Sequence, residues 1–171
     1  MGQPLAIAAV AVPGRRGLIG IAPYPGRSGD LAADVAALRA WGAAAVLCLV
    51  EAAELDLLQV GALPELVRQA GLQWLHLPIP DMTAPDRRFE DAWRAVRPRL
   101  QALLGDGRPL LIHCRGGLGR SGTIAARLLI EAGVEPEAAI ARVRAARPGA
   151  IETAEQERYL REQQWRAFSR E

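Results

Sequence analysis

Short apolar runs alternate with amphipathic segments along most of the chain. Five apolar runs predict strands, at residues 5–12, 18–22, 45–50, 72–77 and 109–113. Apolar positions at helical spacing predict helices at 30–41, 64–70, 87–104, 121–132, 136–146 and 154–168. Alternation of this kind is typical of a mainly parallel central sheet flanked by helices. We therefore expect an α/β fold and one domain over residues 1–171.

Residues at the ends of these segments support the helix assignments. Gly42, Gly71 and Gly133 each follow a helical pattern, where glycine readily takes the left-handed conformation that ends a helix. Pro136 stands at a first helical position, and residues 153–156 fit a capping box at the start of the last helix.

One segment, residues 113–123, reads His-Cys-Arg-Gly-Gly-Leu-Gly-Arg-Ser-Gly-Thr and lies between a predicted strand and a predicted helix. Glycine-rich backbone that leads into a helix can point consecutive N–H groups, and the positive end of the helix dipole, at one place. Such a loop is suited to a phosphate or sulfate group. The residues expected to bind it are Arg115, Gly116, Gly117, Leu118, Gly119 and Arg120.

The side chains of this segment suggest covalent chemistry. A helix N-terminus and a nearby cation favour the thiolate form of a cysteine, so we expect Cys114 to be a nucleophile. Arg120 offers a planar fork of donors for two phosphoryl oxygens. Ser121 can donate a hydrogen bond to the Cys114 sulfur and make it a better leaving group. Placement and charge neutralisation suffice for phosphoryl transfer, so no metal is required.

The mechanism needs a general acid, and a proline-rich loop at residues 78–86 offers two carboxylates. Asp81 is the expected acid, which would protonate the leaving oxygen and later accept a proton from water. Asp86 directly precedes a predicted helix, where an aspartate commonly caps the first turn. Capping or turn formation is also the alternative for Asp81 itself.

These motifs resemble those of cysteine-based protein phosphatases of the dual-specificity type, and most of all the kinase-associated branch. The pattern His-Cys-x5-Arg-Ser falls on residues 113–121, the Pro-x-x-Asp acid loop on 78–81, and a third motif on 147–156. The resemblance implies a protein tyrosine phosphatase-like fold, with Cys114 as phosphocysteine nucleophile, Arg120 as phosphate binder and Asp81 as acid. Residues 82–84 depart from the family pattern, because Met-Thr-Ala replaces a glycine-containing turn.

Composition excludes several other classes of protein. The net charge is only +2, which gives no reason to expect a nucleic-acid partner. All 21 basic residues are arginine, a bias typical of GC-rich, bacterial-like genomes. Because the chain has no lysine, phosphate loops and pyridoxal sites that depend on a lysine are excluded. Two histidines and two cysteines without ligand spacing predict no metal site, and we expect no cofactor.

The second cysteine, Cys48, lies in an apolar strand, where a buried and inert thiol is the usual finding. A redox disulfide with Cys114 is the alternative. His113 is expected to order the catalytic loop through hydrogen bonds, and His76 to be a strand residue.

The N-terminal apolar run, residues 5–12, is too short to span a membrane and lacks the basic residues that precede a secretory signal. We expect a cytoplasmic monomer without a membrane segment.

The sequence therefore predicts a metal-independent phosphatase for phosphotyrosine, and for phosphoserine or phosphothreonine, in proteins. The alternatives are a phosphatase for phosphoinositides or other small phosphomonoesters and a catalytically weak module that binds phosphoproteins. Gly117, Gly119 and Gly122 also fit the G-x-G-x-x-G spacing of a dinucleotide site, but no strand pattern ending in an acidic residue follows.

Overall fold

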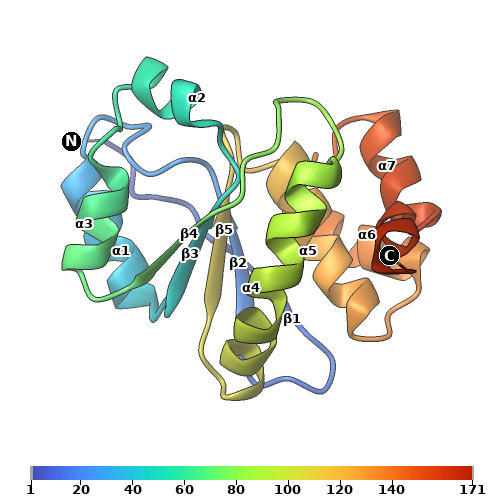
Figure 1. The fold of residues 1–171 in the computed structure, drawn as a ribbon. Helices are drawn as coiled ribbons and strands as arrows, with labels where there is room; N and C mark the ends of the chain where they lie inside the picture. The colour runs from blue at the N-terminus through green and yellow to red at the C-terminus, as the bar shows by residue number, and fades with distance from the viewer. Residues whose placement is uncertain (1, 171) are drawn as a thin grey trace.

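A five-stranded sheet forms the centre of the molecule, in the order β1-β2-β5-β3-β4 (Figure 1). The computed structural model describes residues 2–170, with side chains to residue 168. The strands are β1 (Ala8–Ala11), β2 (Leu18–Ala22), β3 (Ala45–Cys48), β4 (Gln73–His76) and β5 (Leu110–His113). β1 pairs antiparallel with β2 and the other pairs are parallel, so the predicted mainly parallel sheet is confirmed.

The parallel strands end in register at one edge of the sheet. Cys48 at the end of β3 lies opposite both His76 and His113, which end β4 and β5. All four residues of β3 and of β5 are buried, as expected for parallel strands covered on both faces. The segments that leave this edge therefore start from a rigid base.

Helices cover both faces of the sheet (Figure 1). α1 and α3 lie on one face, and α4, α5 and α6 on the other, with α7 outermost. Their bounds are α1 (Leu31–Trp41), α2 (Ala52–Leu57), α3 (Leu63–Gln69), α4 (Arg87–Gly105), α5 (Gly119–Glu131), α6 (Pro136–Ala146), α7 (Ala154–Arg161) and the 3-10 helix η1 (Gln164–Arg170). None of the helices in the described part of the chain combines the length and apolarity needed to cross a bilayer.

The predicted helix ends are largely confirmed. Gly42, Gly71 and Gly133 have positive φ angles of 96°, 84° and 100° just after their helices. Thr153 and Gln156 form the expected capping box, and Pro136 begins α6.

Several element boundaries and one helix were predicted wrongly. β1, β3 and β4 are shorter than the apolar runs 5–12, 45–50 and 72–77, and several apolar residues beyond the strand ends, such as Val12 and Leu49, are buried in the core. α5 begins two residues earlier than predicted, and the last segment breaks after Arg161 into η1. The short helix α2 was missed because six residues carry little periodicity.

A buried charged cluster joins the helices on the α4–α7 face. Arg127 of α5 contacts Glu90 of α4 at 2.7 Å and Glu131 at 3.1 Å, and donates to the Tyr159 hydroxyl at 2.6 Å. Its guanidinium carbon lies 4.8 Å from the ring centroid of Trp93, with the Trp165 ring at 4.9 Å. The cation therefore ties α4, α7 and η1 to α5.

Arg127→Met should lower the free energy of unfolding by about 3–5 kcal/mol, because the buried carboxylate of Glu90 would lose its cation. Chemical denaturation measures the change. Arg99→Met, the same change at an exposed position of α4, serves as control and should leave the transition in place. Equal effects of the two substitutions would contradict a structural role for the cluster.

Candidate active site

The loop between β5 and α5 carries the predicted nucleophile. Cys114 directly follows β5 and is only 3% exposed. Gly117 has φ +69°, and a Cβ there would lie 2.5 Å from the carbonyl carbon of Ala22, so only glycine fits this turn. The Tyr24 N–H also donates to the Arg115 carbonyl at 3.2 Å. The segment after β2 therefore packs tightly against the loop.

Arg147 supports the same loop from outside. Its guanidinium donates to the carbonyl oxygens of Gly117 at 3.1 Å and Gly116 at 3.0 Å. A peptide unit whose carbonyl is held outward presents its N–H on the opposite side. Arg147 therefore orients the backbone of the loop that is predicted to bind phosphate. The sequence assigned Arg147 only to the third family motif and predicted no role for its side chain.

The predicted nucleophile and its expected partner are in contact. The Cys114 sulfur lies 3.2 Å from the Ser121 hydroxyl oxygen. Ser121 lies in the first turn of α5, and no side chain caps that N-terminus. The free amides of the first turn and the positive end of the helix dipole are thus directed at the loop that holds the thiol.

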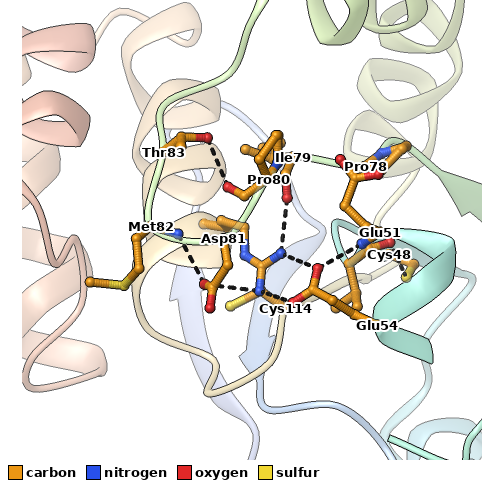
Figure 2. A network of polar contacts seen from close by, with 12 residues as sticks. Cys48, Glu51, Glu54, Pro78, Ile79, Pro80, Asp81, Met82, Thr83 and Cys114 are labelled. Carbon is orange, nitrogen blue, oxygen red and sulfur yellow. Dashed lines mark hydrogen bonds and ion pairs between the residues drawn. The ribbon is translucent and has the colours of Figure 1, made fainter. Parts of the chain in front are cut away.

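Arg120 is held by a network of acceptors (Figure 2). Its two terminal nitrogens donate to the Glu54 carboxylate at 2.8 and 3.0 Å. Further contacts reach the Ile79 carbonyl at 2.9 Å and the Asp81 carboxylate at 3.1 Å. The side chain is buried, so its guanidinium has a fixed orientation beside Cys114.

Glu54, which the sequence analysis missed, lies on α2. Burial opposes its ionisation, but the hydrogen bonds from Arg120 and from Glu51 hold its pKa below the ordinary value. The carboxylate therefore stays charged and pairs with the arginine. The signal that could have found it is the spacing Glu51-x-x-Glu54, a helix start directly after a strand that ends at the site.

The acid loop brings Asp81 to the same place. Its carboxylate accepts from the Met82 N–H at 3.0 Å, and Thr83 donates to the Pro80 carbonyl at 2.7 Å. Met82 has φ +64°, so a side chain occupies the left-handed position that glycine would favour. Asp86 accepts from the Phe89 N–H at 2.9 Å and caps α4, as predicted.

Gln156 connects the acid loop to the start of α7. Its amide nitrogen donates to the Thr83 carbonyl at 3.2 Å, and its amide oxygen accepts from the N–H groups of Glu152 and Thr153 at 2.9 and 3.2 Å. The side chain is fully buried. The third sequence motif therefore holds the acid loop in position.

His113, the last residue of β5, is buried. Its Nδ1 atom lies 3.2 Å from the Cys114 carbonyl oxygen. Because a carbonyl only accepts, Nδ1 carries the proton and Nε2 keeps a lone pair, which has no partner among the described residues. Burial lowers the pKa of His113 from 6.5 to about 4, so the ring is neutral at pH 7. The expected ordering role is supported.

The stability of the fold should fall as the pH drops from about 6.5 to 4. The unfolded chain protonates His113 in this window and the folded chain does not, so the stability is complete above 6.5 and decreases by about 3 kcal/mol by pH 4. Urea denaturation across this range measures it. His113→Asn removes the titrating group and should flatten the curve; an unchanged slope in this variant would contradict the assignment.

The second cysteine is inert in this structure. Burial raises the pKa of Cys48 to about 12, and its thiol lies 3.8 Å from the Val50 carbonyl. Both cysteines are free thiols. His76 also contacts the Val50 carbonyl, at 2.6 Å, and is a strand residue as expected.

The segment after the catalytic loop does not have the arrangement of a dinucleotide site. α5 is followed directly by α6, so the second strand that such a site requires is not present there. Residues 2–170 also contain no group of three or more His, Cys, Asp or Glu side chains that could hold a metal ion.

A pocket of about 360 Å³ opens over the catalytic loop. It brings together the predicted residues Asp81, Arg115, Gly116 and Leu118. Its remaining lining residues are Tyr24, Arg27, Leu58, Met82 and Glu152.

Comparisons with known proteins agree with this geometry. The chain is 37% identical to cyclin-dependent kinase inhibitor 3 of Rattus norvegicus over 132 residues, which cover 75% of the chain and 61% of the relative. The human protein is 36% identical over the same shares. The chain thus matches about three fifths of the length of these curated relatives.

Solved structures show the same fold. A crystal structure of kinase-associated phosphatase, with its catalytic-site cysteine replaced by serine, has a TM-score of 0.87 at 29% identity and 98% coverage of both chains. The active form of Tk-PTP has a TM-score of 0.67 at 33% identity, with 91% and 95% coverage. The expected protein tyrosine phosphatase-like fold and the resemblance to the kinase-associated branch are confirmed.

A family model described as the Swiss Army Knife protein, DSP-PTPase phosphatase domain, matches residues 26–160. These residues contain the acid loop, the catalytic loop and the third motif. The chain therefore belongs to the dual-specificity family of cysteine-based phosphatases.

Proposed function

We propose that this protein hydrolyses phosphate monoesters in phosphoproteins through a phosphocysteine intermediate, without a metal ion. The contact of Arg120 with Asp81, beside the Cys114–Ser121 pair, carries the proposal. The proposed proton donor Asp81 thus lies against the proposed phosphate binder Arg120, and the loop that carries Cys114 contributes Arg115, Gly116 and Leu118 to the pocket that Asp81 lines.

In the first step the Cys114 thiolate attacks phosphorus and forms the S–P bond while the P–O bond to the leaving group breaks. Arg120 and the loop amides bind the equatorial oxygens, and Asp81 in its acid form gives its proton to the leaving oxygen.

In the second step water attacks phosphorus and the S–P bond breaks. Asp81, now a carboxylate, accepts a proton from the water, and inorganic phosphate and the Cys114 thiolate are released. The Ser121 hydroxyl, 3.2 Å from the sulfur, stabilises the departing thiolate. The cycle returns the enzyme to its starting state without a redox or metal partner.

The relatives support phosphoprotein substrates, since they are named as a cyclin-dependent kinase inhibitor and a kinase-associated phosphatase. We further propose that the protein acts as a cytoplasmic monomer. A panel of phosphotyrosine, phosphoserine and phosphothreonine peptides and a phosphoinositide, assayed with a chelator present, tests the substrate class. Strict dependence on added metal, or turnover of the phosphoinositide alone, would contradict the proposal.

Asp81→Asn should reduce kcat/KM for a phosphopeptide by roughly 10²- to 10⁴-fold but for an activated aryl phosphate by about tenfold or less. A good leaving group needs little protonation, so it depends less on the acid. Asp86→Asn is the matched control, because the carboxylate of Asp86 caps α4. Equal losses on both substrates in Asp81→Asn would show that Asp81 is not the acid.

A further inference from the structure

The pocket over the catalytic loop has an uneven charge distribution. Two arginines line it, Arg27 from the segment after β2 and Arg115 from the loop itself. Two carboxylates, Asp81 and Glu152, line it from the acid loop and from the segment that precedes α7. A ligand in this pocket therefore meets separate basic and acidic groups.

Both arginines are available to a ligand. Arg27 and Arg115 are exposed, and within the described part of the chain neither is within ion-pairing distance of a carboxylate. Several other surface arginines of the protein, by contrast, are paired with a glutamate. Arg88 with Glu51 is one example, at 2.6 Å. A free guanidinium beside a phosphate site is a ready partner for a second anion.

The backbone that carries the two arginines is fixed. The Tyr24 N–H donates to the Arg115 carbonyl, which joins their two segments. Gly26, next to Arg27, donates its N–H to the buried Asp34 carboxylate at 2.7 Å. Both arginines thus extend from anchored backbone, so the position of a second anion relative to the scissile phosphate is restricted.

We infer that Arg27 and Arg115 form a second anion-binding site, which selects phosphopeptides with an acidic or second phosphorylated residue within one or two positions of the scissile phosphoresidue. The inference rests on the proposed phosphatase function. Arg115 directly follows Cys114, so the second anion lies near the first. An extended peptide advances by about 3.3 Å per residue, which limits the second anion to a near neighbour in sequence.

The same pocket disfavours a ligand with negative charge on every side. The Glu152 carboxylate would repel the further phosphates of a polyphosphorylated head group. Leu58, Met82 and Leu118 offer apolar surface for uncharged parts of a peptide. A peptide that carries one anionic residue beside the scissile phosphoresidue, and is otherwise uncharged, is therefore the better match to this pocket.

Three phosphopeptides of equal length test the inference, with the same phosphoresidue next to a neutral residue, a glutamate or a second phosphoresidue. We expect the wild-type protein to have kcat/KM about three- to tenfold higher for either anionic peptide than for the neutral one. This ratio should fall in Arg27→Gln and in Arg115→Gln, and approach one in the double variant. It should also decrease at high salt. Arg99→Gln, on an exposed part of α4, should keep the wild-type ratio.

The outcomes separate this inference from the proposed function. If the wild-type protein does not hydrolyse an aryl phosphate, the phosphatase assignment is overturned. Aryl phosphate turnover with a wild-type peptide ratio near one, or a ratio that survives in the double variant, would overturn the second site alone. A soluble bisphosphorylated inositol preferred over both anionic peptides, with the preference lost in the same variants, would overturn the choice of a peptide.

Discussion

Cys114→Ser should reduce the turnover of an aryl phosphate by on the order of 10⁴-fold or more. A serine hydroxyl at this position remains protonated at neutral pH. Among the residues that the structure describes, no imidazole or carboxylate hydrogen-bonds with the Cys114 side chain to activate it. Phosphate release with the purified variant measures the loss.

Phosphate binding provides the control for this substitution. Arg120 and the loop amides are unchanged in Cys114→Ser, so the variant should still bind inorganic phosphate in a calorimetric titration. Turnover equal to that of the wild type would show that Cys114 is not the nucleophile. Binding without turnover in the wild-type protein as well would favour a phosphoprotein-binding module over an enzyme.

Arg120→Lys should lower kcat for the same substrate by roughly 10²- to 10³-fold. A lysine ammonium keeps the positive charge but is not planar. It therefore cannot donate from two nitrogens to the Glu54 carboxylate, as the guanidinium does, while holding its remaining N–H groups in a fixed direction toward the substrate. The loss should appear in kcat more than in KM, because the fork is matched to the oxygens of the transition state.

Glu54→Gln, a positioning variant, separates orientation from charge. It removes one charged acceptor of Arg120 but leaves the arginine in place, so its kcat should lie between those of the wild type and Arg120→Lys. An unchanged kcat in Arg120→Lys would contradict a role for planar recognition.

The fold and the central chemistry could be predicted from the sequence because their signals are local. The strand before Cys114, the glycines after it and the start of α5 all lie within residues 110–122. The contact between Cys114 and Ser121 follows from the short loop that joins β5 to α5. The helix-capping roles of Asp86 and Thr153 could likewise be predicted, because a cap depends on a few adjacent positions.

Long-range contacts could not be predicted in this way. Glu54 lies 66 positions from Arg120, and their pairing depends on β3 and β5 ending side by side. Arg147 reaches the carbonyls of the catalytic loop from 30 positions away. No spacing within the sequence encodes these distances, because they are set by the order of strands in the sheet.

Trapping a phosphoryl group on Cys114 is the measurement that tests the central claim most directly. With an activated aryl phosphate, Asp81→Asn should slow the hydrolysis of the intermediate more than its formation, so acid quenching followed by peptide mass spectrometry should find one phosphoryl group on the peptide with Cys114. Continued turnover with no phosphoryl group on that cysteine, or with the group on another residue, would contradict the mechanism.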